Sequence, residues 1–560
     1  MRPAPAREAI DVSRRSAPCR ARSGWGLGTT ALVTLLLAGC ALSPRAEMNY
    51  ARDSLYRLCG DRSSVARCPS LEASVAAVVA AAGRHPDDAY AQGQAVFALT
   101  RSGALVAAQR VVDGCSVEGW WCTMLQGHVA AESGKVLAAE RAFDHMIAQM
   151  PEEVRCKWTD LSWILPDAVW GEIDSSDCLV RVARSETIWW LSDPSHLLEG
   201  SEAKVVHYNR VVLAALHDDQ ILGLRGRVAD GTGHSLSHHR SVLRRGMPDE
   251  RFDRAWERTY RQTYSLIPDS EALLAPTHAP ARAWRLGEGG GSVQTEVDLW
   301  LLDPLPSQVA FFERGDSILV TAAIDLTHGP VLDGGGIWEA AMILGQGPEG
   351  PMLITSSAES RDHYVFRRSV PWDRYLVSLE AITSSGLART RFGNGLTHPS
   401  ESPTRVSDLL LFSAEDLSGV ESLDEALPTM RGGTRWTSGE RVGLYLEVYG
   451  PSRPDGYDVS VSLTPRSSVL GRIGRVLGFE SRRPVEVTWR NQSDDNVAVV
   501  SFTVALANVE PGDYVVEVTV ETGSRRSIRV SRQLRVLDGD TLGRVESGRT
   551  EVPAEESRPN

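Results

Sequence analysis

Residues Val442–Val448 read VGLYLEV, and residues Tyr457–Leu463 read YDVSVSL. In a strand, successive side chains point to opposite faces, so this period of two gives each segment one apolar face and one polar or small face. Tyr514–Val520 and Ile528–Val536 repeat the alternation nearer the C-terminus. Strands of this kind, separated by turns about every ten residues, are typical of antiparallel sandwiches. We therefore predict a β-sandwich over residues 405–540.

A second set of short apolar segments precedes the first. It comprises Ile318–Leu326, Met352–Thr355 and Tyr375–Ile382, and it predicts another β-sandwich over residues 293–396. The Pro- and Ser-rich stretch Thr397–Thr404 divides the two sandwiches. Both are expected to be antiparallel and Ig-like, because each combines several short alternating strands with turn signals.

Upstream, the period becomes helical. In Leu71–Pro151, Ala and Val recur at spacings of three and four, and Gly103 and Gly134, a distance of 31 residues apart, stand where helices would turn. Small residues, Phe143 and a proline after the second helix resemble a tetratricopeptide (TPR) repeat. An ordinary bundle of helical hairpins is the alternative. We predict a disulfide-stapled, TPR-like helical domain over residues 70–182.

The segment between the helices and the strands has motifs of its own. Trp190–Pro194 reads WLSDP, His207–Arg210 reads HYNR, and Arg240–Asp249 reads RSVLRRGMPD. This order resembles the GWxTD-domain proteins of environmental bacteria, although Ala229–Gly233 stands in place of the Gly-Trp-x-Thr-Asp motif itself. The resemblance implies a small α/β unit over residues 183–286 and a multidomain α+β protein. It implies no chemistry.

The N-terminal region carries an export signal. The apolar stretch Trp25–Leu37 is too short to span a membrane comfortably, and it ends in Leu37-Ala38-Gly39-Cys40. This end resembles the lipobox of bacterial lipoproteins, in which a diacylglyceryl group is attached to the cysteine thiol and a peptidase cuts before it. We predict a lipoprotein signal peptide over residues 1–39, lipidation at Cys40, and a tether over residues 40–69. A chance cysteine after a secretory signal and a short membrane anchor are the alternatives.

The predicted lipid anchor sets the expected location. Acyl chains each contribute about 0.8 kcal/mol per buried methylene, so they would hold the protein on the lipid bilayer. No Asp follows Cys40, and resemblance to enterobacterial sorting rules favours the outer membrane.

The charge of the chain excludes some partners. Six arginines and two acidic residues leave with residues 1–39, so the rest has 53 basic and 70 acidic side chains, a net charge of −17. An acidic protein is unsuited to bind nucleic acid or an anionic membrane surface through its folded part. Residues 541–560 are polar and acidic, and we expect them to be disordered.

The cysteines favour an oxidising compartment. Apart from Cys19 and Cys40 the chain has an even number, which is typical of disulfides in exported proteins. The local scheme is the simplest of the fifteen possible pairings. Zinc is a weaker alternative, because Cys115 and Cys122 lack the tight spacing of structural sites. The disulfide candidates in this scheme are Cys59 with Cys68, Cys115 with Cys122, and Cys156 with Cys178.

No motif places a catalytic group. Gly233–Ser237 reads GHSLS, which lacks the last glycine of a nucleophile elbow, and no buried strand precedes it. The cluster His234, His238 and His239 has no recognised set of further metal ligands. HExxH, P-loop and dinucleotide motifs are absent from the sequence. We expect no catalytic residue, no metal and no cofactor.

These observations predict a membrane-anchored envelope lipoprotein that acts as a non-enzymatic interaction or scaffold protein for a protein partner. One alternative is an envelope hydrolase, in which His207 or residues 234–239 would meet a carboxylate in a polar pocket. Another is a glycan-binding protein that would expose coplanar rings of Trp158, Trp163 and Trp170. We prefer to place these tryptophans in a core around the disulfides.

Overall fold

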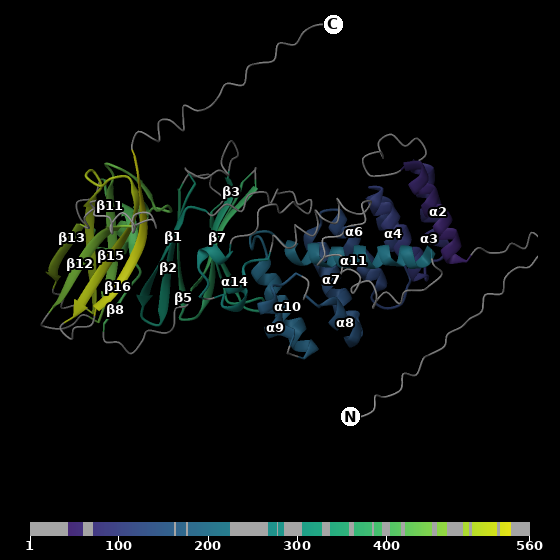
Figure 1. The fold of residues 1–560 in the computed structure, drawn as a ribbon, viewed down its shortest axis with the longest axis horizontal. Helices are drawn as coiled ribbons and strands as arrows, with labels where there is room; N and C mark the ends of the chain where they lie inside the picture. Colours follow the sequence, from purple (N-terminus) through teal and green to yellow (C-terminus); the bar gives the residue numbers. More distant parts are fainter. Residues whose placement is uncertain are drawn as a thin grey trace, which may run out of the picture.

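The structure is a computed structural model of the 560-residue chain. It describes residues 43–59, 71–161, 164–174, 177–224, 267–276, 278–284, 305–326, 337–357, 363–383, 386–394, 404–415, 420–450, 456–466, 485–491, 496–522 and 527–538. The predicted signal peptide, Cys40, the Arg240–Asp249 motif and the predicted tail lie outside these ranges. So do residues 229–239, with their histidine cluster. A helical part is followed by stacked sheets that are antiparallel except for the parallel pair β10–β16 (Figure 1), which agrees with the predicted α+β class.

The helical part extends from Ser43 to Trp284. No helix in the described ranges is long and apolar enough to span a membrane. Its helices are α2 (Pro44–Cys59), α3 (Leu71–Arg84), α4 (Ala89–Arg101), α5 (Leu105–Asp113), α6 (Trp121–Glu132), α7 (Val136–Gln149), α8 (Glu152–Trp158), α9 (Asp167–Asp174), α10 (Cys178–Ser192), α11 (Glu202–Leu224), α14 (Ser270–Leu274) and the 3₁₀ turn η2 (Ala281–Trp284).

Helix α2 corrects the tether predicted over residues 40–69. Met48 and Leu55 lie on the same face of the helix, two turns apart, and both are buried in the helical core. The buried guanidinium of Arg52 donates to Oε1 of Gln94 at 2.9 Å, and Nε2 of Gln94 donates to the carbonyl of Leu216 in α11 at 2.7 Å. The segment looks polar in the sequence because its charged residues outnumber its buried ones. Its apolar face nevertheless packs into the helical core.

Helices α4 to α7 form two antiparallel hairpins with glycine at their turns. Gly103 has φ +77° and Gly134 has φ +74°, a backbone conformation that favours glycine. Where α6 and α7 cross, a Cβ on Gly127 would lie 2.5 Å from the ring of Phe143. The small residue therefore lets the aromatic ring pack directly against the helix backbone.

Helix α11 shows that the boundary expected at residue 183 does not separate two cores. Its residues Val205, Tyr208 and Val212 belong to the same apolar cluster as α4, α6 and α7. Within residues 183–286, the described segments are helical or irregular, and none of them is a strand. The described part of the predicted α/β unit is thus an extension of the helical part.

The sheets form four layers, which we number from the helices outward. Sheet I has the order β4-β3-β6-β7, sheet II β1-β2-β5, sheet III β14-β11-β8 with β9 also on β11, and sheet IV β10-β16-β15-β12-β13. Their strands are β1 (Ser307–Arg314), β2 (Ser317–Asp325), β3 (Ile337–Gly345), β4 (Met352–Ser357), β5 (His363–Pro371), β6 (Tyr375–Thr383), β7 (Gly386–Asn394), β8 (Arg405–Val406), β9 (Leu410–Ser413), β10 (Arg435–Thr437), β11 (Arg441–Tyr449), β12 (Tyr457–Pro465), β13 (Val485–Asn491), β14 (Val497–Ala505), β15 (Gly512–Thr522) and β16 (Ser527–Leu537).

Each pair of neighbouring sheets encloses its own core. Val320 of sheet II faces Met342 of sheet I in the first sandwich, and Leu444 of sheet III faces Val518 of sheet IV in the second. Between the sandwiches, sheets II and III pack back to back with the short helix α15 (Leu423–Ala426) and the 3₁₀ turn η4 (Leu427–Thr429) at their side. The helices and the four sheets therefore follow one another along the long axis of the molecule (Figure 1).

Candidate functional site

The residues of the WLSDP motif meet the first sandwich at a buried charged junction, which we call the helix–sheet junction. After α10, the loop of residues 193–201 crosses the outer face of sheet I, where the Glu380 side chain of β6 has no exposed surface. The Ser195 hydroxyl donates to Oε2 of Glu380 at 2.7 Å, and the His196 amide donates to the same oxygen at 3.0 Å. The Ser378 hydroxyl donates to Oε1 at 2.6 Å. The carboxylate therefore joins the loop to the sheet.

Two arginines of β7 complete this junction. Arg391 contacts Glu380 at 3.4 Å, and its side chain is also fully buried. Arg391 also donates to the Ser378 hydroxyl of β6 at 3.3 Å, and both guanidinium groups donate to backbone carbonyls that belong to the helical part. Arg391 donates to Leu191 and Asp193, each at 3.1 Å, and Arg389 donates to Asp193 at 2.6 Å, Pro194 at 2.9 Å and Trp284 at 3.4 Å.

The partners of Glu380 keep its side chain ionised. Burial by itself raises the pKa of a carboxyl group, but the positive charge of Arg391 and the hydroxyl donors Ser378 and Ser195 outweigh this effect and lower the pKa of Glu380 below its usual value. The pKa of His196 is itself brought to about 3, mainly by burial, so its imidazole is neutral at physiological pH. At that pH the compensating positive charge comes from the arginines.

An aromatic ring covers one side of this junction. Trp190 stacks on His196 with centroids 5.5 Å apart and planes at 19°. The Trp190 ring also lies over Gly345 of β3, where a Cβ would be 2.6 Å from Cζ2 of the ring. Because Gly345 has no side chain, the Trp190 ring can lie directly against the sheet.

Two further carboxyl groups at this junction are protonated more readily than usual. Burial raises the pKa of Asp193 well above its usual value, although Arg391 acts against it. Burial also raises the pKa of Glu202, and the nearby Asp193 raises it further. Within the described residues, Oε2 of Glu202 and Nε2 of His196 have no hydrogen-bond partner. A neutral Glu202 costs far less to bury than a carboxylate would.

The HYNR motif lies in the core of the helical part. His207 and Tyr208 are almost fully buried, and the His207 ring packs 4.9 Å from the Trp189 ring. Burial brings the pKa of His207 to about 3. Asn209 bridges His128 of α6 at 2.6 Å and Glu132 at 3.0 Å. These side chains pack helices together and are closed to a substrate.

A second buried carboxylate joins the two sandwiches at the sandwich–sandwich junction. The Glu447 carboxylate of β11 accepts a hydrogen bond from each Nη atom of Arg314 in β1, at 2.6 and 2.8 Å. The hydroxyls of Tyr445 and Tyr449 donate to it at 3.0 and 2.8 Å. Arg314 is 36% exposed, so this pair lies at the rim of the contact. Below it lies the apolar cluster between sheets II and III, with Phe312 and Phe412 at its centre.

The structure places some of the residues singled out from the sequence. Cys115 is joined to Cys122 and Cys156 to Cys178, with Cα atoms 5.8 and 5.7 Å apart, and these are two pairs of the local scheme. The Cys59 side chain, Cys68 and Cys40 lie outside the described residues.

The tryptophans expected near the disulfides are only partly described. Trp158 is buried and Trp170 half-buried, while Trp163 is not described. Trp158 packs edge-on against Trp120 at 5.4 Å, which is an arrangement of a core and not of an exposed sugar platform.

The helical part has an open pocket at its surface. A shallow open pocket beside the second disulfide is lined by Glu152, Glu153, Cys156, Asp160 and Arg181. Within the same ranges, no three His, Cys, Asp or Glu side chains are grouped so that they could hold a metal ion. The buried carboxylates described above serve contacts between layers.

The sequence reasoning missed the sheet side of the helix–sheet junction. Glu380, Arg389 and Arg391 occupy alternate positions of β6 and β7, where charged residues normally indicate a solvent-facing side. A weak signal was present, because polar side chains alternate with apolar ones in both strands, and the Trp-rich helical segment has apolar rings that must be buried.

Comparisons with known proteins add little. No protein-family model matches the chain, and no curated protein matches it. Red sea bream transglutaminase is similar with 10% identity and a TM-score of 0.14 over 42% of this chain, which spans 32% of the length of that protein. The FN1-FN3 domains of chicken CNTN1 (11%, TM-score 0.14, 41% of this chain and 68% of that chain) and the receptor tyrosine kinase Torso (9%, TM-score 0.12, 44% and 79%) are also similar. At these TM-scores the similarities carry no argument.

Proposed function

We propose that this chain is an exported lipoprotein, anchored through Cys40 in the outer membrane, that serves as a non-enzymatic scaffold for a protein partner in the cell envelope. The observation that carries this proposal is the joining of the layers at both junctions. Glu380 ties the helices to sheet I, and Glu447 ties sheet II to sheet III. The chain then acts as one elongated body that holds its last sandwich at a set distance from its first helix.

The residues at the two junctions favour a mechanical role over a chemical one. Catalytic acids and bases must reach a substrate, so they lie in clefts. Here the groups with shifted pKa values, His196, His207 and Glu380, are enclosed and are held by protein groups or aromatic packing. We infer that these buried groups align the helices and sheets with one another.

The finer family resemblances support the same role. The glycine turns and the close contact of Gly127 with Phe143 are features of TPR-like hairpins, which commonly bind peptides on their concave face. The WLSDP residues of the GWxTD-like motif line the helix–sheet junction. We propose that this motif holds a helical module on a sheet module. The two disulfides fit an oxidising compartment.

Intact-mass analysis of the protein from membranes of its own host, without reductant, tests the anchor. We expect a chain that starts at Cys40 and carries acyl chains, together with a Cys40→Ala variant that lacks them. An unlipidated wild-type chain would overturn the anchor.

Crosslinking in the envelope, with wild type beside Glu380→Gln, tests the scaffold. The partner should be captured with wild type and much less with the variant if layer alignment matters. Equal capture by both proteins would contradict the proposed role of the helix–sheet junction.

A further inference from the structure

The far sandwich, formed by sheets III and IV, has an open sheet edge at β14 in the described part of the chain. Strand β14 pairs with β11 on one side, and within the described residues no strand pairs with its other side. Its sequence, Val497–Ala505, reads VAVVSFTVA, with no charged residue, proline or glycine. An edge strand of this length and composition is a ready template for another strand. Natural proteins normally protect such an edge or use it.

Three of the other sheet edges, those at β13, β1 and β4, carry protection that β14 lacks. Strand β13, the neighbouring edge of sheet IV, contains Glu486 and Arg490, and β1 ends in Glu313 and Arg314. On β4, a guanidinium covers part of the edge, since Arg368 donates to the carbonyl of Ile354 at 3.4 Å. Charged edges discourage pairing, so β14 stands out as the edge that permits it.

Apolar side chains are exposed along the same flank of the sandwich. Val487 of β13 is 56% exposed and Val497 of β14 is 44% exposed. Trp489 packs edge-on against Phe502 at 5.4 Å, which closes the core there only in part, because both side chains are half-buried. A strand laid along β14 would cover this flank and satisfy its free backbone groups.

We propose that β14 pairs antiparallel with β14 of a second copy of this chain, about a two-fold axis through Ser501. The nine residues then oppose one another completely, with Ser501 opposite Ser501, Val500 opposite Phe502 and Ala498 opposite Val504. Residues that face the core in one copy meet residues that face the core in the other, as a continuous sheet requires. Because the strand has no charge, no like charges meet across the axis.

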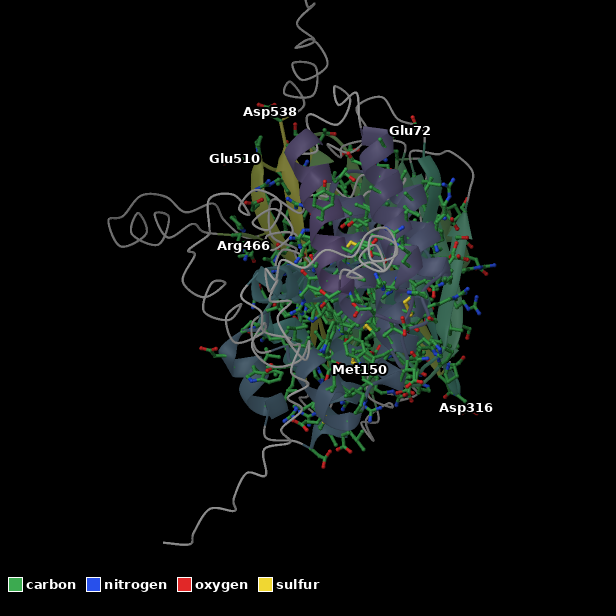
Figure 2. All side chains as sticks on the ribbon, turned by 90° about the vertical axis from the view of Figure 1, so that its right-hand side faces the viewer. Glu72, Met150, Asp316, Arg466, Glu510 and Asp538 are labelled. Atoms are coloured by element: carbon green, nitrogen blue, oxygen red, sulfur yellow. A yellow bond between two sulfur atoms is a disulfide. The ribbon has the colours of Figure 1, made fainter. Side chains whose placement is uncertain are left out.

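The stacking of the layers explains why the partner is a second copy. A two-fold axis that continues an antiparallel sheet runs perpendicular to that sheet. Sheet III lies across the long axis of the molecule, between sheets II and IV (Figure 1). The axis therefore runs along the stack, which Figure 2 views from the helical end. Both copies then point their helical ends in the same direction, as two proteins anchored in one membrane must.

This last argument rests on the proposed lipid anchor, whereas the pairing of β14 does not. The test therefore uses the full exported chain with Cys40→Ala, which is free of lipid. We expect light scattering after gel filtration to give twice the chain mass at high concentration. Ser501→Arg should give the mass of one chain, because it places two positive charges face to face.

Cysteine crosslinking tests the register. Ser501→Cys should form a disulfide-linked dimer on mild oxidation, because directly opposed Cα atoms lie within about 7 Å. Thr503→Cys is the matched control on the same strand, and it should not crosslink. Residue 503 opposes 499, so the two cysteines would lie about 13 Å apart along the strands. The Cys40→Ala parent should not crosslink either.

Three results would overturn the proposal. They are a single-chain mass at every concentration without a Ser501→Cys dimer, a dimer that survives Ser501→Arg, and crosslinking through Thr503→Cys in place of Ser501→Cys. A partner strand from a different protein would give the first result. None of them bears on the lipid, which the intact mass of the native protein reports separately.

Discussion

The helix–sheet junction and the sandwich–sandwich junction both place a carboxylate between two layers, yet they are built differently. Glu380 is fully buried with Arg391, and their remaining polar partners are backbone groups and hydroxyls. Glu447 is also buried, but its partner Arg314 reaches solvent, and an apolar cluster supports the contact beneath it. The first contact therefore combines a buried charge network with apolar contacts such as Ile382 against the loop of residues 193–201, and the second depends mainly on apolar packing.

The difference has an energetic reason. A fully buried ion pair loses its hydration, so the removal of one partner leaves an uncompensated charge in the interior. At the rim, water can replace a lost partner. A polar junction also requires one alignment of donors and acceptors, whereas an apolar contact tolerates small shifts. We expect the helix–sheet junction to fix direction and the sandwich–sandwich junction to supply cohesion.

The largest expected effect comes from Glu380→Gln. The substitution keeps the shape but removes the charge that faces Arg391, and it should destabilise the protein by about 3–5 kcal/mol. Urea unfolding followed by Trp fluorescence measures this change, because Trp190 lies at the junction. The double variant Glu380→Met with Arg391→Met should recover much of the loss, since it removes both charges together. A loss below about 0.5 kcal/mol in Glu380→Gln would show that the pair is not held as described.

A smaller effect is expected from Glu447→Gln. This side chain loses its charge opposite Arg314, but the exposed part of Arg314 can turn to water, so we expect a loss of about 1.5 kcal/mol. The same urea experiment applies, with Glu313→Gln at the neighbouring Arg405 pair as a rim control. If Glu447→Gln cost as much as Glu380→Gln, the contrast between the junctions would fail.

The smallest effect is a change of pH dependence in Glu202→Gln. Burial raises the folded-state pKa of Glu202 above its usual value, so its contribution is fully present below about pH 4.3 and is lost as pH rises through the folded pKa. Gln cannot ionise, so the variant should lose less stability than wild type as pH increases. Urea midpoints measured from about pH 5 upward test this, starting just above the usual Glu pKa. The exposed Glu199→Gln should follow wild type, and an unchanged slope in Glu202→Gln would contradict the assignment.

Periodicity predicted the strands better than it predicted their surroundings. The alternation in Val442–Val448 and Tyr457–Leu463 places strands β11 and β12 correctly. The same rule assigns Tyr445 and Glu447 to a solvent face, but sheet II covers that face. Local pattern reports which side chains alternate. It does not report that a third and a fourth layer will cover both faces of a sheet.

The candidate site was predictable on one side only. Trp190 and Asp193 attracted notice because they belong to one short motif. Their partners Glu380 and Arg391 lie more than 180 residues further along the chain. Glu380 belongs to a segment that was predicted only as a strand, and Arg391 belongs to β7, which was not predicted as a separate strand. A single sequence does not show which two distant charged residues form a pair, because each of them has many residues of opposite charge as possible partners.

Helix α2 has a mechanical consequence. Its first residue, Pro44, comes four positions after Cys40, and its buried face is locked onto α3 and α4. With a lipid on Cys40, the four residue steps from Cys40 to Pro44 span at most about 14 Å. The folded protein would then lie directly at the bilayer surface, without a flexible linker between them. A force applied to the sandwich of sheets III and IV would reach the acyl chains without first extending a linker. Tension between the membrane and a bound partner would therefore be transmitted along the stacked layers.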